Sequence, residues 1–174
     1  MPLYTLPAPD EFAPYYGKYV EKVGPDPMAM LEALTLSTPR LLAATSPEKA
    51  EFRYAEGKWS VKEVVGHLSD AERVFAYRAL RIGRADTTDL PGFDENAYVP
   101  AGRFGARTLA DLVAEFASVR AASLTLFRSF DAEAIARRGT ANGQPVTVRA
   151  LLTILAGHEQ HHVKLLRDLY GLAG

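Results

Sequence analysis

Residues 147–170 read TVRALLTILAGHEQHHVKLLRDLY and carry the clearest pattern in the chain. Apolar residues recur along this stretch at alternating intervals of four and three, the spacing of one face of an α-helix. The positions that share this face are Leu151, Leu155, His158, His162, Leu165 and Leu169. A continuous seam of this kind faces the core of a helical bundle. Because two of its six members are histidines, the helix that decides the fold also carries the first candidate functional residues.

Two other long helices are predicted before residue 84. The first spans about residues 26–45, with a proline in its first turn, where proline is tolerated. Pro39 lies inside this helix and is expected to kink or interrupt it. The second spans about residues 60–83 and has the clearest start in the chain, because Ser60 and Glu63 form the S-x-x-E pattern of a capping box.

The third helix starts at Thr108, and the fourth is capped by Thr147 and stopped by Gly171. Residues 84–107, between the second and third helices, have no regular pattern, and a connection of this length is usually a functional loop or partly disordered. Residues 139–145 form a turn.

An irregular arm is predicted over residues 1–27, with one short helical stretch from Pro14 to Val23. The remaining chain is dominated by the four amphipathic helices and has few strand signals. We therefore predict an all-α fold, an antiparallel four-helix bundle, in a single domain of residues 1–174.

The composition narrows the function classes. A net charge of −1 and the lack of a basic run interleaved with aromatic residues give no support to a nucleic-acid partner. The chain has no cysteine, which excludes disulfides, thiolate nucleophiles and iron–sulfur clusters. It also has no basic and apolar leader and no uncharged apolar run of about 18 residues. We expect a cytoplasmic protein with no membrane partner.

His67 lies on the second helix with Val64, Ala71 and Val74 at the same intervals of three and four, so it belongs on or beside that helix's buried face. A buried imidazole is either hydrogen-bonded within the core or a metal ligand, and for His67 alone the first interpretation is the more common. The pair His158 and His162, at i and i+4 inside a leucine seam, favours a metal. Two ligands do not complete a site, and His67 is the candidate third.

The residues His158-Glu159-Gln160-His161-His162 also match H-E-x-x-H, the zinc-protease pattern. In those enzymes the glutamate activates the water on the metal and a third ligand follows downstream. Only twelve residues follow His162, and they contain neither histidine nor glutamate. We therefore reject the protease interpretation.

The chain resembles the DinB-like superfamily, in particular its YfiT-type branch, described as metal-dependent hydrolases. The resemblance covers most of the chain outside the N-terminal arm. It rests on residues 58–68 (KWSVKEVVGHL), 72–78 (ERVFAYR), 90–94 (LPGFD), 138–143 (RGTANG) and 157–162 (GHEQHH).

The resemblance implies a four-helix bundle, often a homodimer, that binds one divalent metal per chain through three histidines. Carried onto this sequence, the ligands are His67, His158 and His162, and His161 lies beside the site. The metal is expected to be Zn²⁺, with Ni²⁺ as the alternative.

Three functions stay open at this point. The first is a hydrolase that uses metal-activated water on a small-molecule substrate, with Asp70, Glu63 or Glu159 orienting a ligand or acting as a general base. For each of these carboxylates, a place on a solvated helix face is the more common interpretation. Substrate contacts are expected from the loop around residues 93–94. The second function is an S-transferase for a low-molecular-weight thiol such as bacillithiol, mycothiol or glutathione. The third is a non-enzymatic metal- or ligand-binding module.

Overall fold

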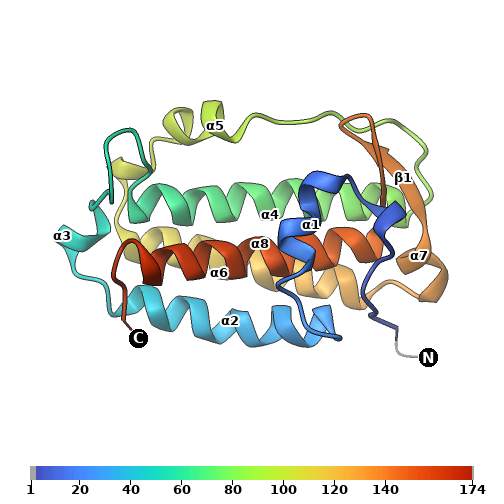
Figure 1. Cartoon of the computed structure of the whole chain (residues 1–174), viewed down its shortest axis with the longest axis horizontal. Helices are drawn as coiled ribbons and strands as arrows, with labels where there is room; N and C mark the ends of the chain where they lie inside the picture. Colours follow the sequence, from blue (N-terminus) through green and yellow to red (C-terminus); the bar gives the residue numbers. More distant parts are fainter. Residues whose placement is uncertain (1–2, 174) are drawn as a thin grey trace.

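The computed structural model of the chain describes residues 3–173 and is dominated by four long helices (Figure 1). They are α2 (Pro27–Ala43), α4 (Val61–Gly83), α6 (Leu109–Arg128) and α8 (Val148–Asp168). Helices α2 and α4 each pack against both α6 and α8. The predicted all-α four-helix bundle is confirmed. No helix in the described part of the chain is long and apolar enough to cross a membrane.

Local sequence determines where the four helices begin. A side-chain oxygen caps each start by accepting a hydrogen bond from the backbone N–H three residues later, at Asp26, Ser60, Thr108 and Thr147. The predicted capping box is present: the Ser60 hydroxyl accepts from the Glu63 N–H at 3.2 Å, and the Glu63 carboxylate accepts from the Ser60 N–H at 2.7 Å. Pro39 does not interrupt α2, which continues to Ala43.

The helix directions differ from the expected antiparallel arrangement. The colours of Figure 1 show that α4 and α6 run in the same direction, and that α2 and α8 both run in the opposite one. The neighbouring pairs α4–α6 and α2–α8 are therefore parallel. A helix as long as α4 spans about 34 Å, so the chain from residue 84 to residue 108 must return over the full length of the bundle. This return explains the length of the connection.

The sequence suggested an irregular connection, but the connection contains the helix α5 (Glu95–Gly102) and the 3₁₀ turn η3 (Phe104–Ala106). The Asp94 carboxylate caps α5 by accepting hydrogen bonds from the backbone of the following residues. Upstream, the Leu90 N–H donates to Thr140 and the Leu90 carbonyl accepts from Asn142, at 3.0 and 2.8 Å. The loop after α4 is thereby tied to the end of the bundle near residue 140.

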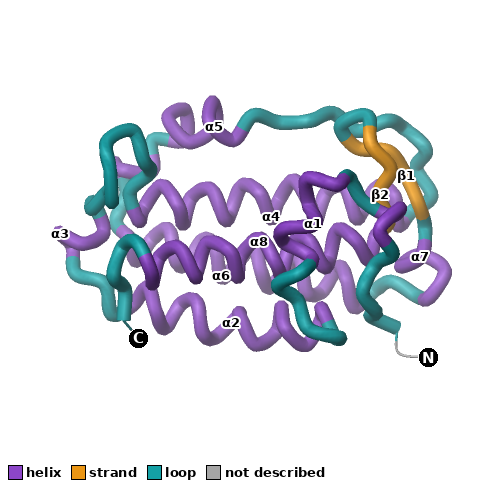
Figure 2. The backbone as a smooth tube through the Cα atoms, viewed as in Figure 1, coloured by secondary structure: helices purple, strands orange, loops and turns teal. Residues whose placement is uncertain are grey.

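A short β-hairpin precedes α8 where the sequence predicted only a turn (Figure 2). After the short helix α7 (Ala132–Ala136), strand β1 (Arg138–Ala141) pairs antiparallel with β2 (Gln144–Thr147). Between the strands, Asn142 and Gly143 have φ values of 54° and 68°. Two successive positive φ values are typical of the tight type I′ turn, which strongly prefers Asn-Gly.

The N-terminal arm crosses the bundle from the hairpin towards the middle of α8 (Figure 1). It contains the 3₁₀ turns η1 (Pro9–Glu11) and η2 (Pro14–Tyr16) and the helix α1 (Gly17–Val20), and the short α3 (Pro47–Ala50) follows α2. The buried Glu11 carboxylate accepts a hydrogen bond from the Thr147 hydroxyl at 2.8 Å and pairs with Arg149. The first two residues of the predicted arm lie outside the described part of the chain.

A polar layer divides the core of the bundle into two apolar clusters. On α8 one cluster extends as far as Ala156 and the other begins at Val163, with the histidines between them. On α6, Arg120 is likewise located between Phe116 of one cluster and Leu124 of the other. The middle of the bundle is therefore where its buried polar groups gather.

The predicted seam of α8 is buried only along its first part. Leu151, Leu155, His158 and His162 are buried, but Leu169 is 45% exposed and Leu166 is fully buried instead. A repeat of 3.5 residues drifts by about 20° per heptad on a straight helix of 3.6 residues per turn. The seam therefore rotates out of the core towards the C-terminus.

Candidate metal centre

Three histidines from two helices meet in the polar layer. His67 comes from α4, and His158 and His162 come from α8. The Nε2 atoms of His67 and His158 are 3.0 Å apart, and the three ring centroids are separated by 4.6 to 4.9 Å. One nitrogen of each ring lies within 4.8 Å of the others. The structure thus brings together the three residues that the sequence proposed as ligands.

Gly157 allows the N-terminal arm to close over these rings. A Cβ atom at this position would lie 2.1 Å from the carbonyl oxygen of Tyr19, so only glycine lets the backbone of α1 rest on α8 here. The approach sets the Tyr19 ring edge-on against the rings of His158 and His161, with centroids 5.3 and 5.4 Å away. From the other side, the Trp59 ring packs on His67 at 4.7 Å. His161 itself is partly exposed, beside the group as expected.

Burial keeps all three imidazoles neutral. It lowers the pKa of His67 to about 4. It also holds the pKa values of His158 and His162 well below the usual range, and the neighbouring imidazoles add to this effect. Neutral imidazole is the form that binds a metal, because its ring nitrogen then offers a lone pair.

The donor set fits a divalent ion. The 3.0 Å separation of His67 and His158 is compatible with two ligands at metal–nitrogen distances of about 2.0–2.1 Å. In addition, the Nδ1 atom of His162 is buried and has no hydrogen-bond partner within the described residues. An unpartnered buried polar atom costs about 1–3 kcal/mol. This cost falls on the His162 ring in the protein alone, and a metal bound through its Nδ1 atom would relieve it.

Two of the carboxylates proposed from the sequence are engaged elsewhere. Glu63 accepts hydrogen bonds from the Ser60 backbone and from Arg53. These bonds lower its pKa although burial alone would raise it. Asp70 is partly exposed and faces Arg73 at 3.4 Å, with a pKa that burial raises. Neither lines the cavity around the histidines.

The third, Glu159, does not belong to a solvated helix face. It is 1% exposed and pairs at 2.5 Å with Arg120, which also pairs with Glu72 at 2.8 Å. Arg120 donates a further hydrogen bond to the Leu31 carbonyl. Burial raises the pKa of Glu159, and the Arg120 charge opposes this shift. The network connects α2, α4, α6 and α8 directly beside the histidine cluster.

A cavity of about 90 Å³ borders the three histidines. Its walls come from the N-terminal arm (Tyr15, Tyr16 and Tyr19), from Trp59, from Phe93 of the loop after α4, and from Glu95 at the start of α5. Glu95 is the single carboxylate among the lining residues, and within the described chain it forms no ion pair and no side-chain hydrogen bond. The sequence predicted substrate contacts from the loop around residues 93–94 and did not indicate Glu95. Asp94 does not line the cavity and caps α5 instead.

Comparison with known proteins places this geometry in a family. The sequence profile of the DinB superfamily matches residues 30–166. The chain belongs to the DinB superfamily. Among solved structures, this DinB-superfamily protein is similar to YfiT from Bacillus subtilis, with 17% sequence identity and a TM-score of 0.71 over 97% of this chain and 95% of YfiT. YfiT is described as a probable metal-dependent hydrolase with an unusual four-helix bundle topology. At this identity the likeness shows the fold alone. No curated protein matches the chain significantly.

Proposed function

We propose that this protein is a metal-dependent hydrolase of small molecules, with one divalent metal held by His67, His158 and His162. The observation that carries the proposal is that three buried, neutral imidazoles converge at the wall of a cavity. Three nitrogen ligands suit Zn²⁺, with Ni²⁺ as the alternative, and they leave a coordination position for water or substrate. The description of YfiT as a probable metal-dependent hydrolase supports the same class of reaction.

The protein's own groups have distinct tasks in this reaction. When bound, the metal supplies Lewis acidity, which polarises a substrate carbonyl and acidifies water. Tyr19 and Trp59 fix the orientation of the imidazoles and exclude bulk solvent from their outer faces. The Glu95 carboxylate accepts a proton from the attacking water and returns it to the leaving group. We assign this task to Glu95 because it lines the cavity, whereas Glu63, Asp70 and Glu159 do not.

An activity screen with a metal analysis tests the proposal. The purified chain is loaded with zinc or nickel, its metal content is measured, and panels of esters and amides are assayed before and after chelation. We expect hydrolysis that chelation abolishes and metal restores.

The same screen includes low-molecular-weight thiols together with electrophilic acceptors. Thiol-dependent turnover without any hydrolysis would replace the hydrolase with an S-transferase. Metal binding with no turnover in either panel would favour the non-enzymatic module. The homodimer implied by the family resemblance stays a prediction, which light scattering of the purified chain tests.

A further inference from the structure

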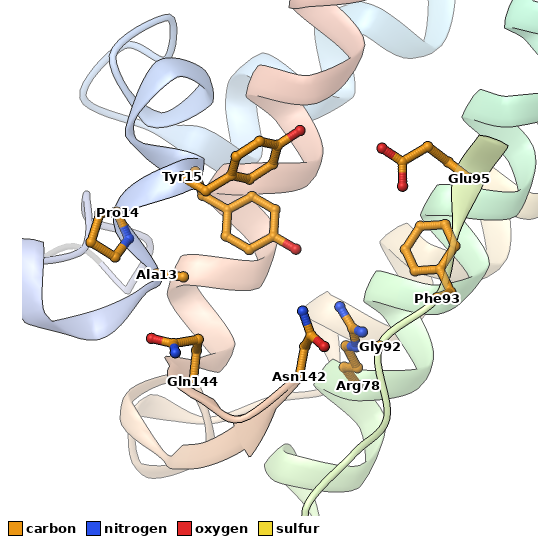
Figure 3. A pocket seen from close by; sticks show the side chains of 10 residues that line it. Ala13, Pro14, Tyr15, Arg78, Gly92, Phe93, Glu95, Asn142 and Gln144 are labelled. Carbon is orange, nitrogen blue, oxygen red and sulfur yellow. The ribbon is translucent and has the colours of Figure 1, made fainter.

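A larger cavity continues from the histidine site towards the β-hairpin. It has a volume of about 590 Å³ and lies between the N-terminal arm, the loop after α4 and the hairpin turn (Figure 3). The two cavities share Tyr15, Tyr16, Phe93 and Glu95 as lining residues, so they adjoin one another. A ligand that reaches the histidines therefore has room to extend as far as the hairpin. The proposed hydrolysis takes place at the histidines and assigns no function to this larger cavity.

Arg78 lines the larger cavity and is absent from the lining of the histidine site. It belongs to α4, and only 3% of its surface is exposed. Of its five N–H donors, one bonds to the Pro91 carbonyl, at 2.8 Å. Figure 3 shows its guanidinium beside Asn142 and Gly92, below the Phe93 ring.

Arg78 has no ionic partner within the described chain. No carboxylate of the described chain, Glu95 included, lies within 4.0 Å of its guanidinium. The other buried arginine, Arg120, is paired with two carboxylates in the same bundle. An anion supplied from outside the chain would provide the missing partner.

The surroundings of Arg78 favour a planar anion. A Cβ atom added at Gly92 would lie 2.4 Å from the Asn142 side-chain oxygen, so the glycine lets the loop and the hairpin turn approach closely. The Phe93 ring lies 5.9 Å from the guanidinium carbon. The polar side chains of Asn142 and Gln144 on the hairpin are neutral amides, which can donate hydrogen bonds without adding charge. Arg78 is the one cationic side chain among the residues that line this cavity. A single guanidinium fork matches a carboxylate better than a doubly charged phosphate.

We propose that Arg78 binds a carboxylate of the substrate at the opposite end of the joined cavity from the three histidines. The inference rests on the proposed function and deepens it by naming the substrate class. The substrate is an elongated molecule with an ester or amide bond at the histidines and a carboxylate several bonds away at Arg78. Arg78 positions this substrate and takes no part in bond cleavage.

Matched carboxylate and amide probes test the proposal by calorimetric titration. The full chain is titrated with 5-phenylpentanoate and with 5-phenylpentanamide, a neutral analogue of the same shape, both metal-loaded and after chelation. In the chelated protein no metal is present to bind the carboxylate, so a preference that Arg78→Gln removes is due to Arg78. We expect the carboxylate to bind at least about tenfold more tightly, equivalent to about 1.4 kcal/mol.

The variant Arg78→Gln should reduce this preference to less than about twofold, and Arg78→Lys should retain part of it, because lysine keeps the charge but loses the fork. The control Arg128→Gln changes an exposed arginine that pairs with Glu32 and lines neither cavity, and should keep the full preference. Metal content should be equal in all four proteins. Equal affinity for the two probes in the wild type, or an unchanged preference in Arg78→Gln, would overturn the proposal. Tighter binding of phenyl phosphate than of the carboxylate would overturn the carboxylate assignment.

One further measurement keeps the proposal testable. If Arg78→Gln does not fold, the Nε–H resonance of Arg78 in the wild type is assigned by comparison with Arg78→Lys. It should shift on addition of the carboxylate and not of the amide, and no shift would contradict the proposal. A failure of the hydrolase proposal is distinguishable from a failure of this one. A wild type that takes up no metal can still bind the carboxylate more tightly than the amide.

Discussion

Replacing Arg120 with methionine should be among the most destabilising single changes in the bundle. Arg120, Glu72 and Glu159 are each about 1% exposed, and Arg120 is the cation that both carboxylates contact, at 2.8 and 2.5 Å. Methionine fills a similar volume but leaves two buried carboxylates without a partner. Breaking a buried ion pair in this way costs about 3–5 kcal/mol. For a chain of this size the melting temperature should fall by roughly 6–20 °C.

The matched control Glu72→Gln should cost much less. It keeps the pair between Arg120 and Glu159, and its amide oxygen still accepts a hydrogen bond from Arg120, so we expect a loss of about 1 kcal/mol. In Arg120→Met the effect should also depend on pH. Burial raises the pKa of Glu159 and Arg120 opposes the shift, so removing Arg120 raises that pKa further. A group whose pKa is higher in the folded than in the unfolded state stabilises the fold at low pH, and this stabilisation is lost as the pH rises.

Urea unfolding followed by circular dichroism at about pH 8 and about pH 5 measures both effects, and the deficit of Arg120→Met should be larger at the higher pH. Arg120 does not compensate the two buried carboxylates if Arg120→Met is no less stable than Glu72→Gln, or if the stability deficit of Arg120→Met is the same at both pH values.

Three other predictions follow from the site. Because burial lowers the pKa of His67 to about 4, the metal-free protein should lose up to about 3 kcal/mol as the pH falls from about 6.5 to 4, where the unfolded chain binds the proton more readily. In urea unfolding across this pH range, the free energy of unfolding should change less with pH in His67→Gln than in the wild type. The same pH dependence in both proteins would contradict the low pKa of His67. Gly157→Ala should destabilise the protein by roughly 1–3 kcal/mol through its clash with Tyr19. The control Gly17→Ala has open space around the added methyl group and should have the melting temperature of the wild type. Equal melting temperatures for the two variants would contradict the prediction. Glu95→Gln should slow hydrolysis by roughly 100-fold or more at unchanged metal content, and a loss below about twofold would exclude Glu95 as the general base.

The sequence predicted those features that depend on neighbouring residues. Capping by Ser60 or Thr147 involves contacts three residues away, so the helix starts are correct. The pair His158 and His162 likewise shares a helix face. The hairpin was missed because its strands have only four residues each, although Asn142-Gly143 is a strong signal for such a turn.

Features that depend on distant segments were beyond a single-sequence prediction. Glu159 is buried because Arg120 faces it from another helix, and no local pattern reveals that partner. Arg78 borders a cavity that forms only when the arm, the loop after α4 and the hairpin come together. The parallel direction of α4 and α6 depends on a connection that crosses the bundle, and an amphipathic pattern contains no information about direction.

The central claim is that His67, His158 and His162 hold one divalent metal, and elemental analysis of three proteins tests it most directly. The wild type, His158→Ala and His161→Ala are loaded with zinc, desalted and measured, with circular dichroism to confirm that each remains helical. His161 is the matched control, since it neighbours the cluster but does not belong to it. We expect about one metal per chain in the wild type and in His161→Ala, and loss of the metal in His158→Ala. A folded wild type that retains no metal, or His158→Ala that retains it fully, would exclude a metal site at these three histidines.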